Sequence, residues 1–377
     1  MSREQALEHM SNALELAARG LGTTRPNPMV GALVVRDGRV VGQGYHHKAG
    51  GPHAEVHALR EAGAKARGAE LIVTLEPCCH VGRTPPCTEA IIEAGISRVW
   101  IGHLDPNPRV AGKGVEFLRQ AGIEVHTGIM ERACAELNAG YNHWMKHGRP
   151  KVTLKLASSL DGKIATASGE SQWITGPKSR RAVHAMRAAS DCIMVGIGTA
   201  LADDPSLTVR DVPFTGPSPT RLIVDSKLRL GPQARVLNQD GAEIIIATSS
   251  AAPQHRRENL QSCGATLIEA SGGDGRVDLK LLFDTLGQKR RQGAVRSILV
   301  EGGGELSASL IEQGLVDELR LFIAPLCIGG DGINGLAPLG VDALSIAPRF
   351  TLTSVTQHGE DVELLFQPRE ENTCSQD

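Results

Sequence analysis

The sequence has few aromatic residues and no excess of either charge. Aromatic side chains make up 3% of the 377 residues, and 40 basic residues are balanced by 42 acidic ones. Proteins that bind single-stranded nucleic acid use basic grooves and aromatic stacking platforms. The composition therefore argues against a nucleic-acid partner, although a small basic pocket could still hold a phosphate.

The sequence also lacks a long apolar run and a regular cysteine framework. No uninterrupted apolar stretch approaches the roughly 20 residues of a membrane span. The first residues carry charges where a signal peptide would need an apolar core. The eight cysteines are scattered, unlike those of small disulfide-bonded secreted domains. We therefore expect a soluble, cytoplasmic protein with reduced thiols and no membrane contact.

A chain of 377 residues is too long for one ordinary core, so two domains are expected. In both halves strand-like runs alternate with helical patterns, which is typical of α/β proteins with helices on both faces of a sheet. Gly148, Arg149 and Pro150 break the pattern. We therefore predict domains at 1–148 and 149–369, followed by a disordered tail at 370–377.

Several elements can be predicted from local patterns. Residues 4–19 form an amphipathic helix with Leu7 and Met10 on its apolar face. The dipeptide Asp37-Gly38 indicates a hairpin turn, because glycine tolerates a positive φ. Residues 131–146 have the pattern of one helix, and the segment around residues 358–359 has the pattern of an antiparallel hairpin at a sheet edge.

The stretch from His53 to Cys87 carries the most specific chemical pattern. It reads H-A-E-V-H and then, after an apolar run, E-P-C-C-H-V-G-R-T-P-P-C. One imidazole and two thiolates suit Zn²⁺ and leave a fourth tetrahedral position open, as in catalytic zinc sites. H-x-E followed by P-C and a later cysteine is typical of zinc deaminases. The sequence thus predicts the ligands His53, Cys78 and Cys87, with Glu55 moving protons. His57, one helical turn on, could be a further ligand or a polar helix residue.

The spacing of the two cysteines leaves the ligand set open. Eight residues separate Cys78 from Cys87, whereas the common pattern has two, so Cys79 and His80 are rival ligands. We prefer Cys78 because it follows Pro77 at the end of an apolar run, where a helix could begin. A helix N-terminus stabilises a thiolate through its dipole and free N–H groups.

Two loops could contribute to binding. A strand-like run ends at Glu301 and is followed by G-G-G-E-L, which opens a helix. Glycines at this position let backbone N–H groups approach a phosphate, although a simple tight turn has the same pattern. The loop D-P-N-P at 105–108 is a turn by composition, and it could also border a pocket.

Four motifs together carry a resemblance to a known family. H-A-E, P-C-C-H-V-G-R-T-P-P-C, L-K-L-A-S-S-L-D-G and V-E-G-G-G-E, in this order and spacing, resemble the RibD family of bifunctional deaminase-reductases of riboflavin biosynthesis. The resemblance covers nearly the whole chain. It implies an N-terminal cytidine-deaminase-like three-layer α/β domain and a C-terminal dihydrofolate-reductase-like α/β domain. It also implies Zn²⁺ and NADPH as cofactors.

The same resemblance implies two reactions. The first is hydrolytic deamination of 2,5-diamino-6-(5-phosphoribosylamino)pyrimidin-4(3H)-one. The second is NADPH-dependent reduction of the ribosyl side chain, which gives 5-amino-6-(5-phosphoribitylamino)uracil. Reductases of this kind usually pair through the C-terminal domain, so a homodimer is expected.

Site residues are also implied by the resemblance. In the deaminase half the substrate would meet Asn27, His46 and Arg83, of which Arg83 could equally be a solvated loop residue. In the reductase half the cofactor would meet Ala157, Trp173, Thr199, Asp203, Ser226, Gly303, Gly304, Glu305, Leu306, Ser307, Ala308 and Ser309. The substrate would meet Lys155, Ser171, Arg187, Leu207, Arg210 and Glu301. Without the resemblance, Ala157, Leu207 and Trp173 would be interpreted as core residues, and Asp203 as part of a turn or helix cap.

Three other interpretations stay open at this point. The chain could be a zinc deaminase of free or RNA-borne bases fused to an unrelated reductase. The zinc could instead be structural, with the C-terminal half serving as an oligomerisation or ligand-sensing module, and such a site would need four protein ligands. Finally, one of the two active sites could be degenerate.

Overall fold

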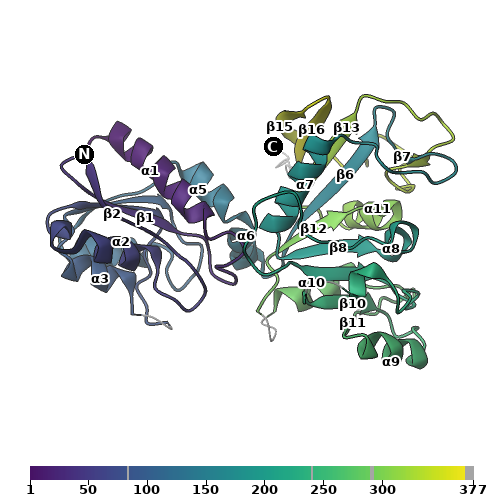
Figure 1. Ribbon diagram of the computed structural model, residues 1–377, viewed down its shortest axis with the longest axis horizontal. Helices are drawn as coiled ribbons and strands as arrows, with labels where there is room; N and C mark the ends of the chain where they lie inside the picture. The colour runs from purple at the N-terminus through teal and green to yellow at the C-terminus, as the bar shows by residue number, and fades with distance from the viewer. Residues whose placement is uncertain (83–84, 239–240, 289–292, 370–377) are drawn as a thin grey trace, which may run out of the picture. The chain divides into compact units, whose positions relative to one another are not determined.

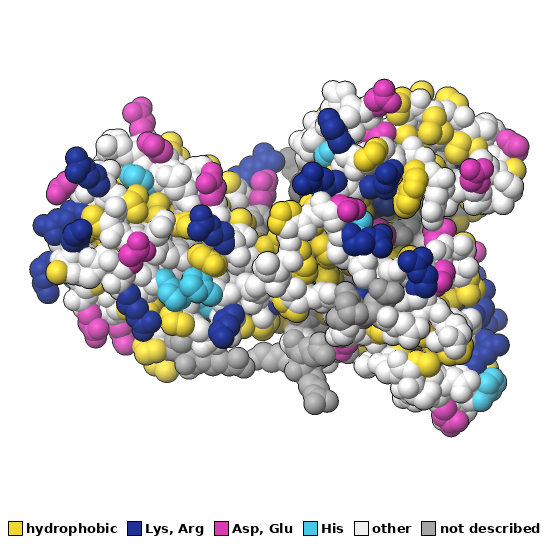
Figure 2. Space-filling model, in the orientation of Figure 1, with side chains coloured by type: hydrophobic (Ala, Val, Ile, Leu, Met, Phe, Trp, Pro, Cys, Tyr) yellow, Lys and Arg dark blue, Asp and Glu magenta, His cyan; other side chains and the backbone are white. Residues whose placement is uncertain are grey.

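The computed structural model describes residues 1–82, 85–238, 241–288 and 293–369 (Figure 1). The chain divides into two compact units, Met1–Gly148 and a second that begins at Arg149. Arg83 and the predicted tail at 370–377 lie outside the described residues. Within the described part, no helix is both long and apolar enough to cross a membrane. On the face shown in Figure 2, basic and acidic side chains are interspersed.

The first unit is built on a five-stranded sheet in the order β2-β1-β3-β4-β5. Its strands are β1 (Gly31–Arg36), β2 (Arg39–Tyr45), β3 (Glu70–Leu75), β4 (Arg98–His103) and β5 (Glu124–His126). β1 and β2 form an antiparallel hairpin in which Asp37 and Gly38 both have positive φ, which confirms the predicted turn. β3, β4 and β5 are parallel, so their carboxyl ends lie at one edge of the sheet.

Helices cover both faces of this sheet. They are α1 (Arg3–Ala18), α2 (Ala54–Ala62), α3 (Cys87–Glu93), α4 (Lys113–Gln120), α5 (Glu131–Leu137) and α6 (Ala139–His147), with a short 3₁₀ turn η1 (Gly63–Ala66). One core cluster joins α1 and α5 to one face of the sheet, and another joins α2, α3 and α4 to the opposite face. The predicted three-layer α/β arrangement is confirmed.

Two local predictions in this unit are wrong in part. On α1 the buried face contains Ala6, Met10 and Ala13, whereas Leu7 is 39% exposed. Met10 is buried as predicted, and alanines, rather than Leu7, lie beside it on the face that packs against the sheet. The helix predicted at 131–146 breaks at Asn138, whose amide donates to and accepts from the backbone of Met29, both at 2.8 Å.

The second unit contains a nine-stranded sheet in the order β11-β10-β9-β8-β12-β6-β13-β16-β15. Its strands are β6 (Lys151–Ser159), β8 (Cys192–Gly196), β9 (Thr220–Val224), β10 (Ile244–Thr248), β11 (Thr266–Glu269), β12 (Ser297–Glu301), β13 (Glu318–Ala324), β15 (Phe350–His358) and β16 (Asp361–Pro368). β7 (Lys163–Ala165) and β14 (Ile333–Asn334) form a small separate pair. β15 and β16 form the predicted antiparallel hairpin, and β15 is the edge strand.

Helices also lie on both faces of the larger sheet. They are α7 (Pro177–Ala189), α8 (Ile197–Asp203), α9 (Gln254–Ser262), α10 (Leu279–Gly287) and α11 (Gly304–Glu312), with a 3₁₀ turn η2 (Arg235–Leu237). One core cluster contains residues of α10 and α11, and a second contains residues of α8, η2 and α9. The α/β fold predicted for the second half is confirmed.

Two glycines of β2 allow α2 to lie directly against the sheet. A Cβ added at Gly42 would lie 2.2 Å from the carbonyl oxygen of Ala58, and one added at Gly44 would lie 2.5 Å from that of Ala54. α2 carries Glu55, and the residue that caps its N-terminus is His53. The close packing of α2 on β2 therefore sets the position of both side chains.

We expect Gly44→Ala to push α2 away from β2 and to lower the free energy of unfolding by about 1–3 kcal/mol, the usual cost of overpacking. The zinc content of the purified protein should fall as well, because His53 moves with the helix. Thermal melting and metal analysis check both effects. Gly231→Ala is the control, because its added Cβ meets nothing within 4 Å. Equal melting temperatures for the two variants would contradict the prediction.

Candidate active sites

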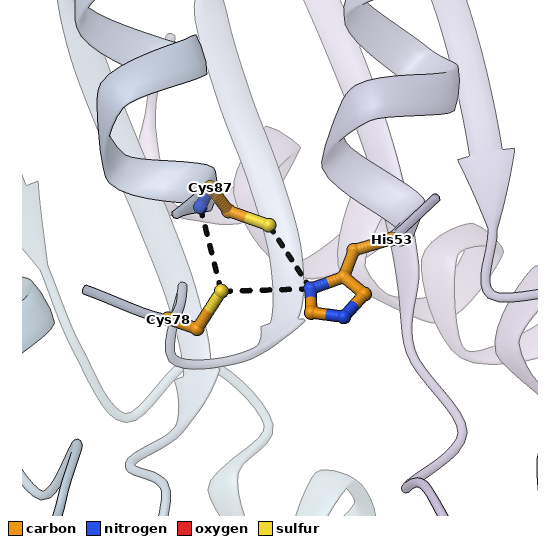
Figure 3. Close-up of side chains that lie close together, drawn as sticks. All are labelled: His53, Cys78 and Cys87. Carbon is orange, nitrogen blue, oxygen red and sulfur yellow. Dashed lines mark hydrogen bonds between the residues drawn. The ribbon is translucent and has the colours of Figure 1, made fainter. Parts of the chain in front are cut away.

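Three side chains from separate elements meet in the first unit (Figure 3). His53 caps α2, Cys87 is the first residue of α3, and Cys78 lies in the loop after β3. His53 Nδ1 lies 3.2 Å from Cys87 Sγ and 3.5 Å from Cys78 Sγ. Their ligand atoms all lie within 4.8 Å of one another. This donor set and spacing fit Zn²⁺, whose bonds to sulfur and nitrogen are about 2.0–2.3 Å long.

The N-terminus of α3 stabilises a thiolate on Cys78. The backbone N–H of Cys87 donates to Cys78 Sγ at 3.4 Å. Hydrogen bonds from the Cys87 thiol and from His53 outweigh burial and lower the pKa of Cys78 to about 4. The same neighbouring thiolate, together with burial, raises the pKa of Cys87. The expectation that a helix begins at Cys78 is wrong, because α3 begins at Cys87 and Cys78 approaches it through space.

Glu55 is buried beside this cluster. Its side chain is 3% exposed, and burial is the main reason that its pKa is raised. It interacts with His53 and Cys87, while its Oε2 atom has no hydrogen-bond partner among the described residues. A buried carboxyl group with a raised pKa and an uncommitted oxygen is suited both to accept and to donate a proton.

The rival ligands lie outside the cluster. Cys79 Sγ is 3.9 Å from the carbonyl oxygen of Arg109, and the ring of His57 stacks on that of His47 with centroids 4.2 Å apart. His80 is also not part of it. Within the described residues this is the only such group of histidine, cysteine and acidic side chains, and it offers three ligands. Three ligands are typical of a catalytic zinc site.

Glu76, which the sequence patterns did not single out, holds the loop that leads to Cys78. Its carboxylate accepts the N–H groups of Asp105 at 3.2 Å, Gly112 at 2.9 Å and Val115 at 3.2 Å. Gly112 and Val115 belong to the N-terminus of α4, and Asp105 opens the D-P-N-P loop. In that loop the N–H two residues later donates to the Asp105 carboxylate, which confirms the predicted turn. In the sequence, the position of Glu76 directly before Pro77 and Cys78 is the feature that could have indicated a role near the metal ligands.

Asn27 and His46 form a pair next to the cluster. Asn27 Nδ2 lies 3.0 Å from His46 Nε2, and His46 Nδ1 lies 3.0 Å from the carbonyl oxygen of Pro52. A carbonyl can only accept, so Nδ1 carries the ring proton and Nε2 accepts from Asn27. Burial lowers the pKa of His46, which keeps the ring neutral. The His46 ring lies edge-on to that of His53, so the pair orients Asn27 beside the cluster.

In the second unit, three of the predicted substrate residues lie together. Glu301 is the last residue of β12, and its register partner on β6 is Lys155. Arg187 of α7 donates from Nε and Nη2 to the Glu301 carboxylate, at 2.5 and 2.9 Å. Burial alone would raise the pKa of Glu301, but Arg187 and Lys155 outweigh it and lower that pKa. Burial lowers the pKa of Lys155 against the opposing charge of Glu301.

Two further predicted residues lie close to this group. Asp203, the last residue of α8, hydrogen-bonds Ser171 and is attracted by Lys155. Trp173 is 65% exposed, and the guanidinium group of Arg180 stacks on its ring, with Cζ 4.5 Å from the ring centroid. The interpretation of Trp173 as a core anchor is therefore wrong.

The glycine-rich turn before α11 forms a cradle. Gly302 and Gly303 have φ values of 89° and 94°, and a Cβ added at Gly303 would lie 3.3 Å from Thr199 Oγ1. The first N–H groups of α11, which have no acceptor within the helix, follow this turn, and such an arrangement fits a phosphate of a dinucleotide. Leu306 and Ala308 are buried in the helix, so these residues could meet a cofactor only through their backbone.

The remaining predicted residues are more dispersed. Ser226 lies two residues after β9, and its hydroxyl accepts the N–H of Val277 at 3.1 Å. Leu207 is 3% exposed and packs in a core cluster, and Ala157 lies half-buried on β6. Ala157 lies two residues after Lys155 on β6, and Leu207 precedes Thr208, whose carbonyl oxygen accepts from Arg187 Nη1.

Comparisons with known proteins agree with this two-part arrangement. The family model "RibD C-terminal domain" matches residues 150–364, and the "Cytidine and deoxycytidylate deaminase zinc-binding region" matches residues 3–103. The riboflavin biosynthesis protein RibD of Escherichia coli is 45% identical over 94% of this chain and 97% of its own length. The chain belongs to the RibD family.

Solved structures of RibD proteins have the same fold. A RibD structure from Acinetobacter baumannii is 41% identical and has a TM-score of 0.87. The match covers 98% of this chain and 100% of that one. A structure from Thermotoga maritima is 37% identical and has a TM-score of 0.84. The match covers 97% of this chain and 99% of that one. That protein is described as a diaminohydroxyphosphoribosylaminopyrimidine deaminase/5-amino-6-(5-phosphoribosylamino)uracil reductase.

As a member of the RibD family, the chain is a bifunctional deaminase-reductase of riboflavin biosynthesis. The zinc-binding deaminase region lies in the first unit, and the reductase domain, of the NADPH-using RibD type, makes up most of the second. The His53, Cys78 and Cys87 cluster lies within the region that matches the zinc-binding model.

We expect one Zn²⁺ per chain, held by three protein ligands. Cys87→Ser should lose the metal, whereas His57→Gln and Cys79→Ser should keep it, because neither side chain belongs to the cluster. Metal analysis of the purified variants by mass spectrometry checks this. Loss of zinc from His57→Gln or Cys79→Ser, with the fold intact by circular dichroism, would instead indicate a four-ligand structural site.

Proposed function

We propose that the chain catalyses two consecutive steps. The first deaminates 2,5-diamino-6-(5-phosphoribosylamino)pyrimidin-4(3H)-one, and the second reduces the ribosyl side chain to give 5-amino-6-(5-phosphoribitylamino)uracil. The observation that carries the proposal is the meeting of His53, Cys78 and Cys87 beside the buried Glu55. The similarity to the Thermotoga maritima protein, which is named for both activities, supports it.

In the first step Glu55 transfers protons. When bound, Zn²⁺ lowers the pKa of a water molecule to about 7. Glu55 accepts a proton from the attacking water at Oε2 and delivers it to the leaving amino group. A C–O bond forms, the C–N bond breaks, and ammonia leaves. Asn27 and His46 orient the pyrimidine, and Arg83, outside the described residues, would meet the phosphate by resemblance.

In the second step the protein orients two ligands. When bound, NADPH would supply a hydride to the sugar C1 of an imine-like, opened form of the ribosyl group, and the imine nitrogen would take a proton from water. The turn at Gly302 and Gly303, with Thr199 beside it, would hold a cofactor phosphate. The substrate would lie against Lys155 and the Arg187–Glu301 pair. By resemblance the cofactor would also meet Ala157, Trp173, Asp203, Ser226 and residues 304–309, and the substrate would meet Ser171, Leu207 and Arg210.

The finer expectations about partners belong to the same proposal. We propose a cytoplasmic homodimer that pairs through the reductase domain and binds no nucleic acid. Support for pairing comes from the edge strand β15, where Leu352 and Val355 are 49% and 61% exposed. An apolar, unpaired sheet edge is unfavourable in water unless it is covered.

Product analysis by mass spectrometry tests the whole proposal. Zinc-loaded protein is given the diaminopyrimidine ribotide, with and without NADPH. Exchange of an amino group for oxygen without NADPH, followed by a gain of two hydrogen atoms when NADPH is added, would establish both steps and their order. If zinc-loaded protein returned the substrate unchanged, the substrate class would be wrong.

Glu55→Gln should keep zinc and lower deamination by about 10²–10⁴-fold, the usual contribution of a positioned general acid-base. The glutamine keeps the shape of the side chain but cannot exchange the proton. Reduction of the deaminated ribotide by the same variant is the internal control and should stay at the wild-type rate. Wild-type deamination by Glu55→Gln would remove Glu55 from the mechanism.

Val355→Lys on β15 should give a monomer, because a charged side chain on this strand opposes apolar pairing. Size-exclusion chromatography with light scattering measures the mass. Leu281→Lys is a matched control, since Leu281 is 45% exposed on α10 of the same unit. A dimer with Val355→Lys would place the interface elsewhere.

A further inference from the structure

Two side chains of α7 hold the segment that follows α8. Arg187 Nη1 donates to the carbonyl oxygen of Thr208 at 2.8 Å, and the backbone N–H of Arg210 donates to His184 Nδ1 at 3.1 Å. His184 and Arg187 are three positions apart in α7, so they lie on one face of the helix. Residues 204–210 have no regular secondary structure, and these two bonds fasten the segment to α7.

The backbone of this segment needs such support. Leu207 and Asp211 have φ values of 49° and 61°, which residues other than glycine seldom adopt. The Leu207 side chain is buried, which fixes the middle of the segment. At its C-terminal end the Arg210 side chain is exposed, and the backbone N–H of Arg210 is held by the bond to His184.

The bond from Arg210 determines the state of the His184 ring. Because a backbone N–H can only donate, His184 Nδ1 must accept, and the proton of the neutral ring is on Nε2. Nε2 lies 3.9 Å from Asp211 Oδ2. The charged groups around the ring are Arg187 and Arg210, with Asp211 and Glu301 opposing them. Burial, followed by the two cations, lowers the pKa of His184, so the neutral form dominates at pH 7.

We propose that His184 is a positioning residue of the reductase half, whose neutral Nδ1 holds Arg210 in place to meet the substrate phosphate. Protonation would put a second N–H opposite that of Arg210, break the bond and loosen the segment. Substrate binding in the reductase step therefore weakens as pH falls. This inference rests on the proposed function, in which Arg187, Leu207 and Arg210 contact the substrate.

Two variants separate the hydrogen bond from the protonation. His184→Asn places an amide oxygen at the position of Nδ1, so it keeps the acceptor but does not titrate. His184→Leu removes the acceptor. At pH 7.5 we expect His184→Leu to raise the KM for the deaminated ribotide on the order of five- to tenfold, the effect of losing one hydrogen bond. His184→Asn should stay close to the wild-type KM, and the KM for NADPH should hardly change in either variant.

The pH profile of this KM tests the protonation. Because the pKa of His184 is lowered by burial and by its two cationic neighbours, the wild-type KM should rise only at a pH below the ordinary histidine pKa of about 6.5. The substrate phosphate also titrates near pH 6. Because asparagine does not titrate, the KM profile of His184→Asn contains the effect of the phosphate without that of His184. The wild-type profile should therefore be steeper than that of His184→Asn. Coincident profiles would overturn the proposed effect of protonation.

Hydrogen-deuterium exchange tests the bond between Arg210 and His184 without relying on activity. At one fixed pH, a peptide covering residues 205–212 should exchange faster in His184→Leu than in His184→Asn or the wild type. His255→Asn is the control, because His255 is exposed on α9 of the same unit. Equal exchange in His184→Leu and His184→Asn would overturn the inference. Failure of the wild type to reduce the ribotide would instead contradict the proposed function. The exchange comparison would then still decide whether His184 holds the backbone of Arg210.

Discussion

Both candidate sites depend on one constraint of parallel sheets: neighbouring strands end at the same edge, and the segments that follow them begin there. In the first unit, the segments after β3 and β4 carry Cys78 and Asp105, and Glu76 joins them by hydrogen bonds. In the second unit, β12 ends at Glu301 and leads directly into the glycine turn of α11. Chemical groups far apart in sequence thus meet without long loops.

The two buried glutamates show how neighbours decide what a carboxyl group does. Glu55 is buried without a cation strong enough to offset burial, so its pKa is raised and it can exchange protons. Glu301 is buried against Arg187 and Lys155, so its pKa is lowered and it stays an anion. The first arrangement suits proton transfer, whereas the second suits a fixed charge that orients other groups.

Much of the architecture could be predicted because it depends on local patterns. The Asp37-Gly38 turn and the alternation of strands and helices are encoded over short stretches, and the zinc cluster comes from residue types with few other uses in that combination. What the sequence did not predict depends on distant partners. Asn138 breaks a helix because it bonds Met29, and Glu76 acts on the start of α4. No local pattern records such pairs.

The bonding of Arg187 limits which substitutions the reductase half can accept at this position. Nε and Nη2 are engaged by Glu301, and Nη1 by the carbonyl oxygen of Thr208. A lysine at this position offers a single ammonium group and cannot reproduce this planar fork. Redesign at position 187 would therefore remove the cation that pairs with the buried Glu301 and change the course of the neighbouring backbone at once. Position 210, whose side chain is exposed, is the more independent place to begin.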